Sequence, residues 1–388
     1  MVMKIAIAGA GIGGLTAATL LAKDGHEVSV FDQFATPRPV GSGLVIQPVG
    51  QAVLGMIGAL DEALDLGNVV HHMLGHEADG GRRVLDVWYS RDGGSRFGLA
   101  IHRASLFTAI WNAAQRQDIT LHQSAAVRNA NDGILTLQDG TSHGPFDLII
   151  DAAGASSPLS PLTSRPLPYG AIWSTVDWPE TRLPTTQLSQ CYRRADRMIG
   201  ALPIGKMPDD PVQKAAIFWS LPRDKYEDWL AGGLDKWKSE AITLWPEFAP
   251  FAAQITDPNQ MTMARYSHGT LRKPYGASIV HIGDAAHRAS PQLGQGANMA
   301  LLDALALARA LRVKKGQDAL ARYAKSRRLH VGIYQAMSAI FTPQYQSDSR
   351  SLPFLRDRIL FPASQIQPIP KLLTAIVCGS MVNPMRGL

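Results

Sequence analysis

The sequence predicts an α/β protein in three parts: a parallel-sheet domain assembled from discontinuous segments, a smaller, mainly antiparallel β-sheet domain and a C-terminal helical tail. Two strand–glycine–helix units, at residues 4–32 and 277–311, predict the first part. Short β-rich runs at residues 171–176, 198–203 and 215–220, separated by Pro, Gly and Asp turns, predict the second. Beyond residue 330 the pattern predicts helices broken by Pro343, Pro353, Pro362, Pro368 and Pro370.

The N-terminal unit has the pattern of a dinucleotide-binding βαβ motif. An apolar strand at residues 4–8 leads into six residues that contain four glycines, and an Ala-rich helix and a second strand follow. Gly9 permits the turn, Gly11 lets the backbone approach a pyrophosphate, and Gly14 lets helix and strand pack closely. Asp32, at the end of the second strand, can accept hydrogen bonds from adenosine ribose hydroxyls. This Rossmann-like unit alone does not separate NAD from FAD.

The second unit favours FAD. A strand at residues 277–282 is followed by Asp284, then by Pro291 and a glycine-containing segment that opens a long apolar helix. A carboxylate at a strand end can bind a ribityl hydroxyl, and glycines let a helix N-terminus lie against a flat ring. That electropositive N-terminus stabilises negative charge on a reduced isoalloxazine.

Together these motifs resemble the group A FAD-dependent aromatic monooxygenases, of which para-hydroxybenzoate hydroxylase is the type member. The segment from Gly41 to Leu44 is similar to the family's loop beside the flavin, and Arg103 to its cofactor-contacting arginine. The resemblance implies FAD contacts at Gly9, Gly11, Ile12, Gly13, Gly14, Asp32, Gln33, Gly43, Leu44, Arg103, Val127, Asp284, Pro291, Gly294, Gln295, Gly296, Ala297 and Asn298.

The resemblance also implies how the chain is divided. A discontinuous, Rossmann-like FAD domain of the GR2 type would comprise residues 1–70, 98–158 and 276–330. Residues 71–97 and 159–275 would form the substrate-binding sheet, and residues 331–388 the C-terminal segment.

The implied reaction is hydroxylation of an electron-rich aromatic or heteroaromatic ring through a C4a-hydroperoxyflavin, with NADH or NADPH as reductant. Pro291 is the expected flavin-edge positioning residue, because it donates no backbone N–H. We interpret His287 as a packing residue rather than an acid–base catalyst. The substrate candidates lie on the β-rich segments, where core packing is the alternative for each: Trp173, Tyr192, Arg193 and Trp219.

One segment departs from the family pattern. After the strand that ends at residue 150, the family carries an Asp-Gly pair and an arginine that are thought to touch both FAD and the nicotinamide coenzyme. Here Ala153 stands at the Asp position and Ser160 at the Arg position. The departure brings coenzyme use into question rather than FAD binding, and Arg165 is a nearby cation that could replace the missing arginine.

Alternative functions on this fold remain open. One is a FAD-dependent reductase or dehydrogenase that inserts no oxygen, and another is a FAD-binding protein without catalysis. A flavin halogenase is disfavoured because the sequence contains no Trp-x-Trp-x-Ile-Pro segment. A Baeyer–Villiger enzyme is disfavoured because a second GxGxxG and a Phe-x-Gly-x-x-x-His signature are missing.

Composition limits the partners. Only two cysteines argue against a disulfide framework and a multi-cysteine metal site, and we expect no metal. The net charge of +6, with basic residues gathered at 309–328, is modest and favours a solvated helix face over a surface for an anionic cofactor or substrate, and we expect no nucleic-acid partner. No uncharged apolar run reaches the roughly 18 residues of a membrane span. We expect a cytoplasmic monomer or homodimer with a small aromatic substrate and no integral membrane segment.

Overall fold

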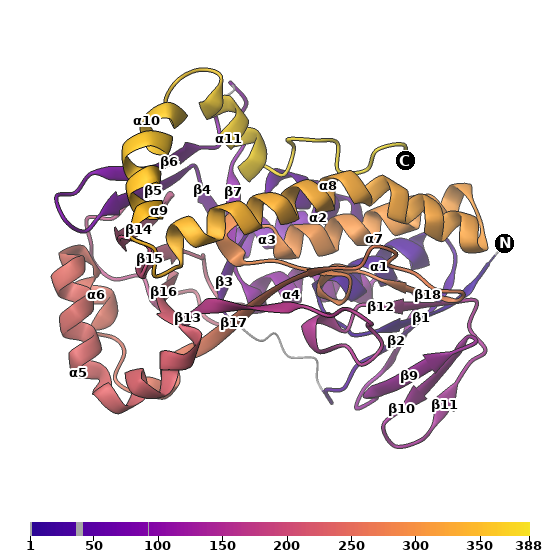
Figure 1. Ribbon diagram of the computed structural model, residues 1–388. Helices are drawn as coiled ribbons and strands as arrows, with labels where there is room; N and C mark the ends of the chain where they lie inside the picture. Colours follow the sequence, from indigo (N-terminus) through magenta and orange to yellow (C-terminus); the bar gives the residue numbers. More distant parts are fainter. Residues whose placement is uncertain (1, 36–41, 92) are drawn as a thin grey trace.

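The computed structural model describes residues 2–35, 42–91 and 93–388. Within these ranges the strands form one five-stranded sheet, one eight-stranded sheet and two three-stranded sheets (Figure 1). None of the helices in the described ranges is long and apolar enough to cross a membrane.

The five-stranded sheet is parallel throughout, so the carboxyl ends of its strands meet at one edge. Its strands are almost wholly apolar, as expected for a sheet with both faces covered. In spatial order they are β18 (Ile279–His281), β12 (Leu148–Asp151), β1 (Lys4–Ala8), β2 (Glu27–Phe31) and β8 (Ile119–His122).

Helices and two small sheets surround this parallel sheet. Helix α1 contacts both α7 and α4, and its buried residues join the largest hydrophobic core of the chain. These helices are α1 (Ile12–Lys23), α2 (Pro48–Ile57), α3 (Leu60–Leu66), α4 (Arg103–Gln115) and α7 (Gly296–Val313). One small sheet contains β3 (Gly43–Ile46), β7 (Gly98–His102) and β4 (Asn68–Val70), and the other contains β9 (Val127–Asn131), β10 (Ile134–Leu137) and β11 (Ser142–His143).

The eight-stranded sheet is antiparallel except for one parallel pair, β14 with β5. In spatial order it contains β19 (His287–Arg288), β17 (Thr262–Thr270), β13 (Arg165–Asp177), β16 (Lys214–Pro222), β15 (Arg197–Pro203), β14 (Gln187–Arg193), β5 (His72–Glu77) and β6 (Arg83–Trp88). The β-rich runs expected from the sequence are confirmed as parts of β13, β15 and β16. We propose that the domain boundaries expected from the sequence follow this division into sheets.

The two faces of the eight-stranded sheet have different neighbours. Helices α5 (Tyr226–Leu244) and α6 (Ala249–Ala252) cover one face through a core rich in Trp and Phe. The other face packs against the small β3–β7–β4 sheet, where Val45 and Ala100 meet Leu202 and Ala216. Side chains alternate between faces along a strand, so neighbouring residues of one strand serve different cores.

The tail differs in one respect from the sequence expectation. Helix α8 (Gly316–Tyr345) runs through Pro343 without breaking, because this proline lies in the last turn, where few further backbone bonds depend on it. Pro353 and Pro362 likewise lie within one continuous helical stretch, residues 351–364, whereas Pro370 occupies the first turn of the last helix, where the missing N–H costs little. Beyond α8 lie α9 (Ser351–Leu355), a π-helical turn (Arg356–Leu360), α10 (Phe361–Ser364) and α11 (Ile369–Val377).

A buried ionic cluster fastens α7 to α8 and to the loop after β18. Asp303 of α7 is fully buried and accepts hydrogen bonds from the Gly283 N–H at 2.9 Å, from Arg327 Nε at 2.7 Å and from His287 Nε2 at 2.7 Å. Burial alone would raise the pKa of Asp303, but His287 and Arg327 outweigh it and hold the pKa well below its usual range. The carboxylate therefore stays charged and paired. Removing one partner of such a cluster is expected to cost about 3–5 kcal/mol.

His330 extends this cluster toward the tail and makes its stability sensitive to acid. It is fully buried, its Nδ1 lies 3.3 Å from Arg327 Nη1, and its Nε2 lies 3.0 Å from the Gly379 carbonyl oxygen. Burial, and then Arg327, lower the pKa of His330 to about 4. An unfolded histidine titrates near about 6.5. Between these two pH values the unfolded state binds a proton that the folded state refuses, so stability is lost as pH falls through this window.

We therefore predict that His330→Gln is destabilised by about 1–2 kcal/mol at pH 7.5 but loses less stability than the native chain between pH 6.5 and pH 4. Urea unfolding at several pH values measures both quantities. The control His71→Gln, which changes an exposed histidine, should retain the native pH dependence. Equal loss of stability in native and His330→Gln proteins would contradict the assignment.

Candidate functional site

Three chain segments meet at the carboxyl edge of the parallel sheet. The glycine-rich turn follows β1, Asp32 follows β2, and the turn from Gly283 to Ala285 follows β18. In open α/β sheets this edge is where ligands bind. The structure thus brings together the two ends of the chain that carry the predicted cofactor motifs.

The glycines of the first turn have different roles. A side chain at Gly9, which has φ of +103°, would approach the Ala152 carbonyl oxygen to 2.7 Å, and one at Gly14 would approach the Gly9 carbonyl oxygen to 1.9 Å. Both are therefore required by the packing of the protein itself. A side chain at Gly11 would meet no protein atom within 4 Å. The space in front of Gly11 is open, as close approach of a pyrophosphate to the backbone requires.

Asp32 is oriented by the turn that it faces. Its Oδ2 accepts the Ala10 N–H at 2.7 Å, and its Oδ1 accepts the Phe34 N–H at 3.0 Å. Each carboxylate oxygen keeps a further lone pair, and the side chain is partly exposed. The carboxylate is thus fixed at the strand end with acceptor capacity to spare.

The N-terminus of α7 contains polar groups that the described residues leave unsatisfied. Gln47 Nε2, Gln292 Nε2 and Gln295 Oε1 are all buried without a hydrogen-bond partner there. Gln47 is fully buried, and its Nε2 lies close to Gly294, since a side chain on that glycine would approach it to 3.3 Å. A buried unpaired amide costs about 1–3 kcal/mol, so such groups indicate a missing partner.

These observations fit a bound FAD. Gly296, like Gly11, would place a side chain in open space, and the orphaned amides lie where the polar edge of a flat ring is expected. Gln47 was missed by the sequence reasoning. Its signal is that it interrupts the apolar run of β3 immediately before Pro48.

Asp284 and Arg103 lie near enough to each other for their charges to interact. Both side chains are exposed to solvent, yet desolvation by the surrounding protein raises the pKa of Asp284 and lowers the pKa of Arg103. Each side chain also acts on the pKa of the other through its charge. A side chain that is both exposed and desolvated lies in a hollow open on one side.

The loop at Pro291 is anchored from two directions. Pro291 itself is exposed, and the preceding Ser290 donates its N–H to His268 Nε2 at 2.9 Å. The Ser290 hydroxyl also bonds Ser338 and Thr342 of α8. His268 must be unprotonated at Nε2 to accept, and desolvation followed by the charge of Arg165 lowers its pKa.

Several other expected contacts have a role within the protein. The Asn298 side chain is fully buried and bonds the Gln47 N–H and the Val45 carbonyl, so it fastens α7 to β3. Gln295 donates to the Val377 carbonyl of α11. A side chain at Gly43 would approach Ile204 to 2.3 Å.

The remaining expected cofactor residues have the following positions. Ile12 and Gly13 begin α1, Ala297 lies in the first turn of α7, and Leu44 lies in β3. Gln33 is exposed directly after Asp32, and Val127 begins β9. Gly41 lies outside the described residues.

The four substrate candidates fall on two different faces of the large sheet. Trp173 and Tyr192 pack with Met198 and Phe218 on the face opposite α5. Trp219 is buried against Trp237 of α5. Arg193 lies on the α5 face too, where it bonds a residue of that helix. Only Trp173 among the four is partly exposed on the face that packs against β3.

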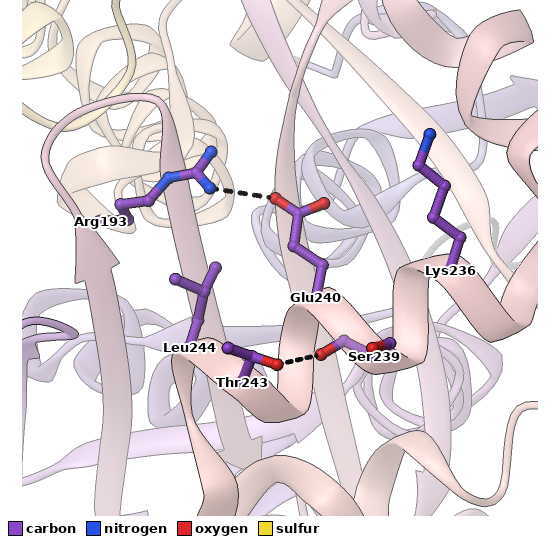
Figure 2. Close-up of a pocket in the computed structure, with 6 residues that line it drawn as sticks. All are labelled: Arg193, Lys236, Ser239, Glu240, Thr243 and Leu244. Carbon is purple, nitrogen blue, oxygen red and sulfur yellow. Dashed lines mark hydrogen bonds and ion pairs between the residues drawn. The ribbon is translucent and has the colours of Figure 1, made fainter.

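Arg193 belongs to a shallow surface depression of about 430 Å³ beside α5, lined also by Lys236, Ser239, Glu240, Thr243 and Leu244 (Figure 2). Its guanidinium points to Glu240 at 3.3 Å and bonds Asp196 at 2.6 Å. These ion pairs engage Arg193 and Glu240, two of the three charged side chains that line the depression. It lies on the sheet face away from the cofactor loops, so we assign the chemistry to the other face.

Tyr266 of β17 was also missed by the sequence reasoning. Its hydroxyl accepts a hydrogen bond from Trp173 Nε1 at 2.9 Å, which joins the two rings on the face that carries the cofactor loops. Burial raises the pKa of Tyr266, so the phenol stays protonated. Tyr266 could not be singled out from the sequence, because a tyrosine on a strand is usually a core residue.

The altered segment packs against the FAD loop. Asp151 accepts bonds from the Ala153 N–H, from Ser157 Oγ and from His281 Nδ1, which closes the turn without a carboxylate at position 153. Ser160 Oγ donates to the Ala285 carbonyl at 2.5 Å.

A guanidinium nevertheless stands beside this segment. Arg288 donates to Ser164 Oγ at 3.1 Å and to the Asp284 carbonyl at 3.0 Å. Arg165, the cation expected to substitute, is exposed at the start of β13.

Comparison with known proteins agrees with this geometry. Residues 226–334 match a family model described as FAD binding domain, and residues 7–38 match one described as NAD(P)-binding Rossmann-like domain. The chain is similar to 3-hydroxybenzoate 6-hydroxylase of Klebsiella oxytoca, with 24% identity covering 82% of each protein. It is also similar to 2-heptyl-3-hydroxy-4(1H)-quinolone synthase of Pseudomonas aeruginosa, with 26% identity over 92% of this chain and 94% of that protein.

Among solved structures, a variant of Klebsiella pneumoniae HpxO complexed with FAD has the same fold. Its TM-score is 0.80 at 19% identity, covering 98% of this chain and 100% of that one. The sequence likenesses extend over most of the chain, and the fold, the FAD motifs and the relatives agree. The resemblance to the group A FAD-dependent monooxygenases is thereby confirmed, with FAD as the cofactor.

Proposed function

We propose that this protein hydroxylates a small, electron-rich aromatic or heteroaromatic ring, using molecular oxygen and NADH or NADPH. The observation that carries the proposal is the Trp173–Tyr266 pair, which presents two partly exposed rings beside both cofactor loops. Relatives named for 3-hydroxybenzoate and for a 3-hydroxy-4(1H)-quinolone support a ring that bears a hydroxyl or carbonyl oxygen.

The position of this pair is fixed from both sides. Ser42, in the loop before β3, donates to the carbonyl of Ser174, next to Trp173. His268, two residues beyond Tyr266 on the same face of β17, accepts the N–H of Ser290, next to Pro291. The aromatic pair therefore stands between the two loops that the sequence assigns to the flavin.

The pair has the chemistry to orient a ring. Tyr266 accepts from Trp173 with its oxygen, so its own O–H hydrogen can be donated to a substrate oxygen. The raised pKa keeps that hydrogen in place at neutral pH. Trp173 supplies a flat apolar wall against which an aromatic substrate can stack. Tyr192 is buried and packs in the same hydrophobic cluster as Trp173, so it supports the Trp173 ring.

In the proposed arrangement FAD would be held by both cofactor loops. Gly11 would face the pyrophosphate, Asp32 the adenosine ribose, Asp284 the ribityl chain, and the N-terminus of α7 the ring. Bound FAD supplies the activation of oxygen and its transfer to the substrate. Pro291 donates no N–H, so the loop places no backbone donor of this residue at the edge of the flavin.

Product analysis with isotopically labelled oxygen tests the function. We predict that one phenol, aniline or hydroxylated heteroaromatic in a panel acquires one labelled oxygen atom, in a reaction that requires both oxygen and NAD(P)H. Substrate turnover without label would instead indicate the reductase or dehydrogenase alternative. Failure of the whole panel, with FAD bound and reducible, would favour a non-catalytic FAD protein.

The same assay examines the aromatic pair. Tyr266→Phe should raise the substrate KM about tenfold, as loss of one hydrogen bond worth about 1.4 kcal/mol implies, and should divert more reducing equivalents to hydrogen peroxide. Tyr226→Phe, which changes a tyrosine on the α5 face of the sheet, is the matched control and should behave as the native enzyme does. If Tyr266→Phe has the same KM and the same peroxide yield as Tyr226→Phe, Tyr266 is not part of the substrate site.

A second prediction concerns FAD binding. Asp284→Ala should weaken FAD binding by about 1.5–3 kcal/mol, because a charge-assisted hydrogen bond to a ribityl hydroxyl is lost. Fluorescence titration of the apoprotein with FAD measures the affinity. Asp318→Ala, an exposed acid at the start of α8, serves as the control. If the FAD affinity of Asp284→Ala is unchanged, this carboxylate does not bind the ribityl chain.

A third prediction concerns the coenzyme. Ser160 is occupied by its bond to Ala285, and we propose that Arg288 provides the anion contact that arginine provides in this segment of the family. Arg288→Ala should raise the NAD(P)H concentration for half-maximal flavin reduction about tenfold or more, while Arg288→Lys should recover only part of the loss.

Anaerobic rapid-mixing absorbance measures this reduction, with FAD content checked for each variant because Arg288 also lies near Asp284. Arg312→Ala, which removes a surface ion pair with Asp24, is the control. An effect confined to Arg165→Ala would place the coenzyme contact at the start of β13 instead.

A further inference from the structure

The helices after α8 expose an unusual amount of apolar surface. We define the tail face as Phe354, Leu355, Ile359, Leu360, Ile366 and Leu372, whose exposed fractions are 63%, 38%, 53%, 39%, 66% and 49%. Large apolar side chains are scattered singly on most protein surfaces, whereas a contiguous group usually marks an interaction site. In Figure 1 the helices that carry this face, α9, α10 and α11, stand at the outer end of the molecule.

The polarity of the first tail helix is inverted. Residues 351–364 form one continuous helical stretch, and its inward positions include Arg356 at 2% exposure and Asp357 at 5%. The Arg356 guanidinium bonds Asp357 and the Gln344 carbonyl. An ordinary surface helix buries its apolar stripe and exposes its charges. Here the charged pair holds the helix to the body of the protein.

The outward stripe follows helical spacing. Phe354, Leu355, Arg358 and Ile359 repeat at intervals of three and four residues and are all exposed. The apolar side chains therefore lie on one side of the helix with a cation among them. These exposed side chains are therefore not the margin of a hydrophobic core that other parts of the described chain cover.

Within residues 349–388 the exposed charged side chains are all cationic. Between residues 349 and 388 the only carboxylate side chain is that of Asp357, which is buried and paired. Arg350, Arg358 and Lys371 are exposed. Close by, Trp88 is 38% exposed, and its carbonyl accepts the Thr374 hydroxyl of α11. Exposed apolar and aromatic side chains flanked by lysine and arginine are the pattern of a segment that lies in the interface of an anionic membrane.

We propose that the tail face docks this protein on the surface of an anionic lipid bilayer. The apolar side chains would enter the boundary between headgroups and acyl chains, while Arg350, Arg358 and Lys371 contact lipid phosphates. Attachment is peripheral, since none of the described helices can span the bilayer. The inference does not depend on the chemistry of the cofactor site.

A second copy of the chain is the competing occupant, and the charges disfavour it. In a two-fold contact the same patch faces itself. Three exposed cations would then oppose three others, residues 349–388 offer no exposed carboxylate side chain to compensate them, and Asp348 just before the segment accepts the Tyr169 hydroxyl. An anionic membrane surface can accept both the apolar side chains and the cationic side chains of the tail face.

The test uses the full chain with FAD bound and vesicles of phosphatidylcholine, with or without phosphatidylglycerol. We expect sedimentation with the mixed vesicles but not with phosphatidylcholine alone, and at least tenfold weaker binding when salt is raised from 50 mM to 500 mM, conditions chosen to screen surface charge. Phe354→Ser/Ile359→Ser should reduce the binding at least tenfold, and Arg350→Gln/Arg358→Gln/Lys371→Gln should do the same.

Val313→Ser is the matched control, because Val313 is 60% exposed beside two lysines at the end of α7 yet outside the tail face. It should bind as the native chain does. Each variant must keep its FAD absorbance and unfolding temperature. Vesicle binding that is missing in the native chain, or equal in native and tail-face variants, overturns the proposal. A change from oligomer to monomer in Phe354→Ser/Ile359→Ser, without vesicle binding by the native chain, would assign the face to a second copy.

Discussion

The carboxylate of Asp303 is the contact on which the architecture of the site depends. It is fully buried, and it bonds the backbone of the turn after β18, His287 beyond that turn and Arg327 of α8. A buried charge is tolerated only when such partners compensate its desolvation. The turn that bears Asp284 therefore has its position set by α7 and α8 rather than by its own sequence. The same cluster gives His287 a structural part, because its Nε2 bonds Asp303 and so helps to hold that turn.

Successive side chains along the strands of the large sheet point to opposite faces. One face carries the proposed substrate contacts, and the other carries a hydrophobic core. Along β13 and β17, residues that point toward the cofactor loops include Trp173, Tyr266 and His268. Their neighbours Ile172 and Met263 pack instead under α5. The strand period of two residues thus places an aromatic wall beside the flavin loops and a hydrophobic core directly behind it. The core fixes the strands, and the strands fix the distance between the wall and the cofactor.

The departure at Ala153 and Ser160 is absorbed without loss of structure. Asp151 supplies the carboxylate that closes the turn, and Ser160 ties the segment to the FAD loop through Ala285. Arg288 brings a guanidinium to the same neighbourhood from a different strand. A change that looks like the loss of two functional groups along the chain is therefore a redistribution of charge in space.

The sequence by itself determined the parallel sheet, the glycine-rich turn and the identity of the cofactor, because each follows from local spacing: strand, glycines, helix and a carboxylate at a strand end. It also indicated Asp32, Asp284 and Pro291. It did not indicate Gln47 or Tyr266, and it ranked Trp219 and Arg193 with Trp173. Only the tertiary structure decided these points, because the face that a strand residue occupies depends on which helix or sheet packs against it, and because an unpaired amide is recognised only when every neighbouring partner is known. The same reason applies to the tail. The sequence indicated helices after residue 330, but only packing decided that the charged pair at Arg356 and Asp357 faces inward and the apolar side chains outward.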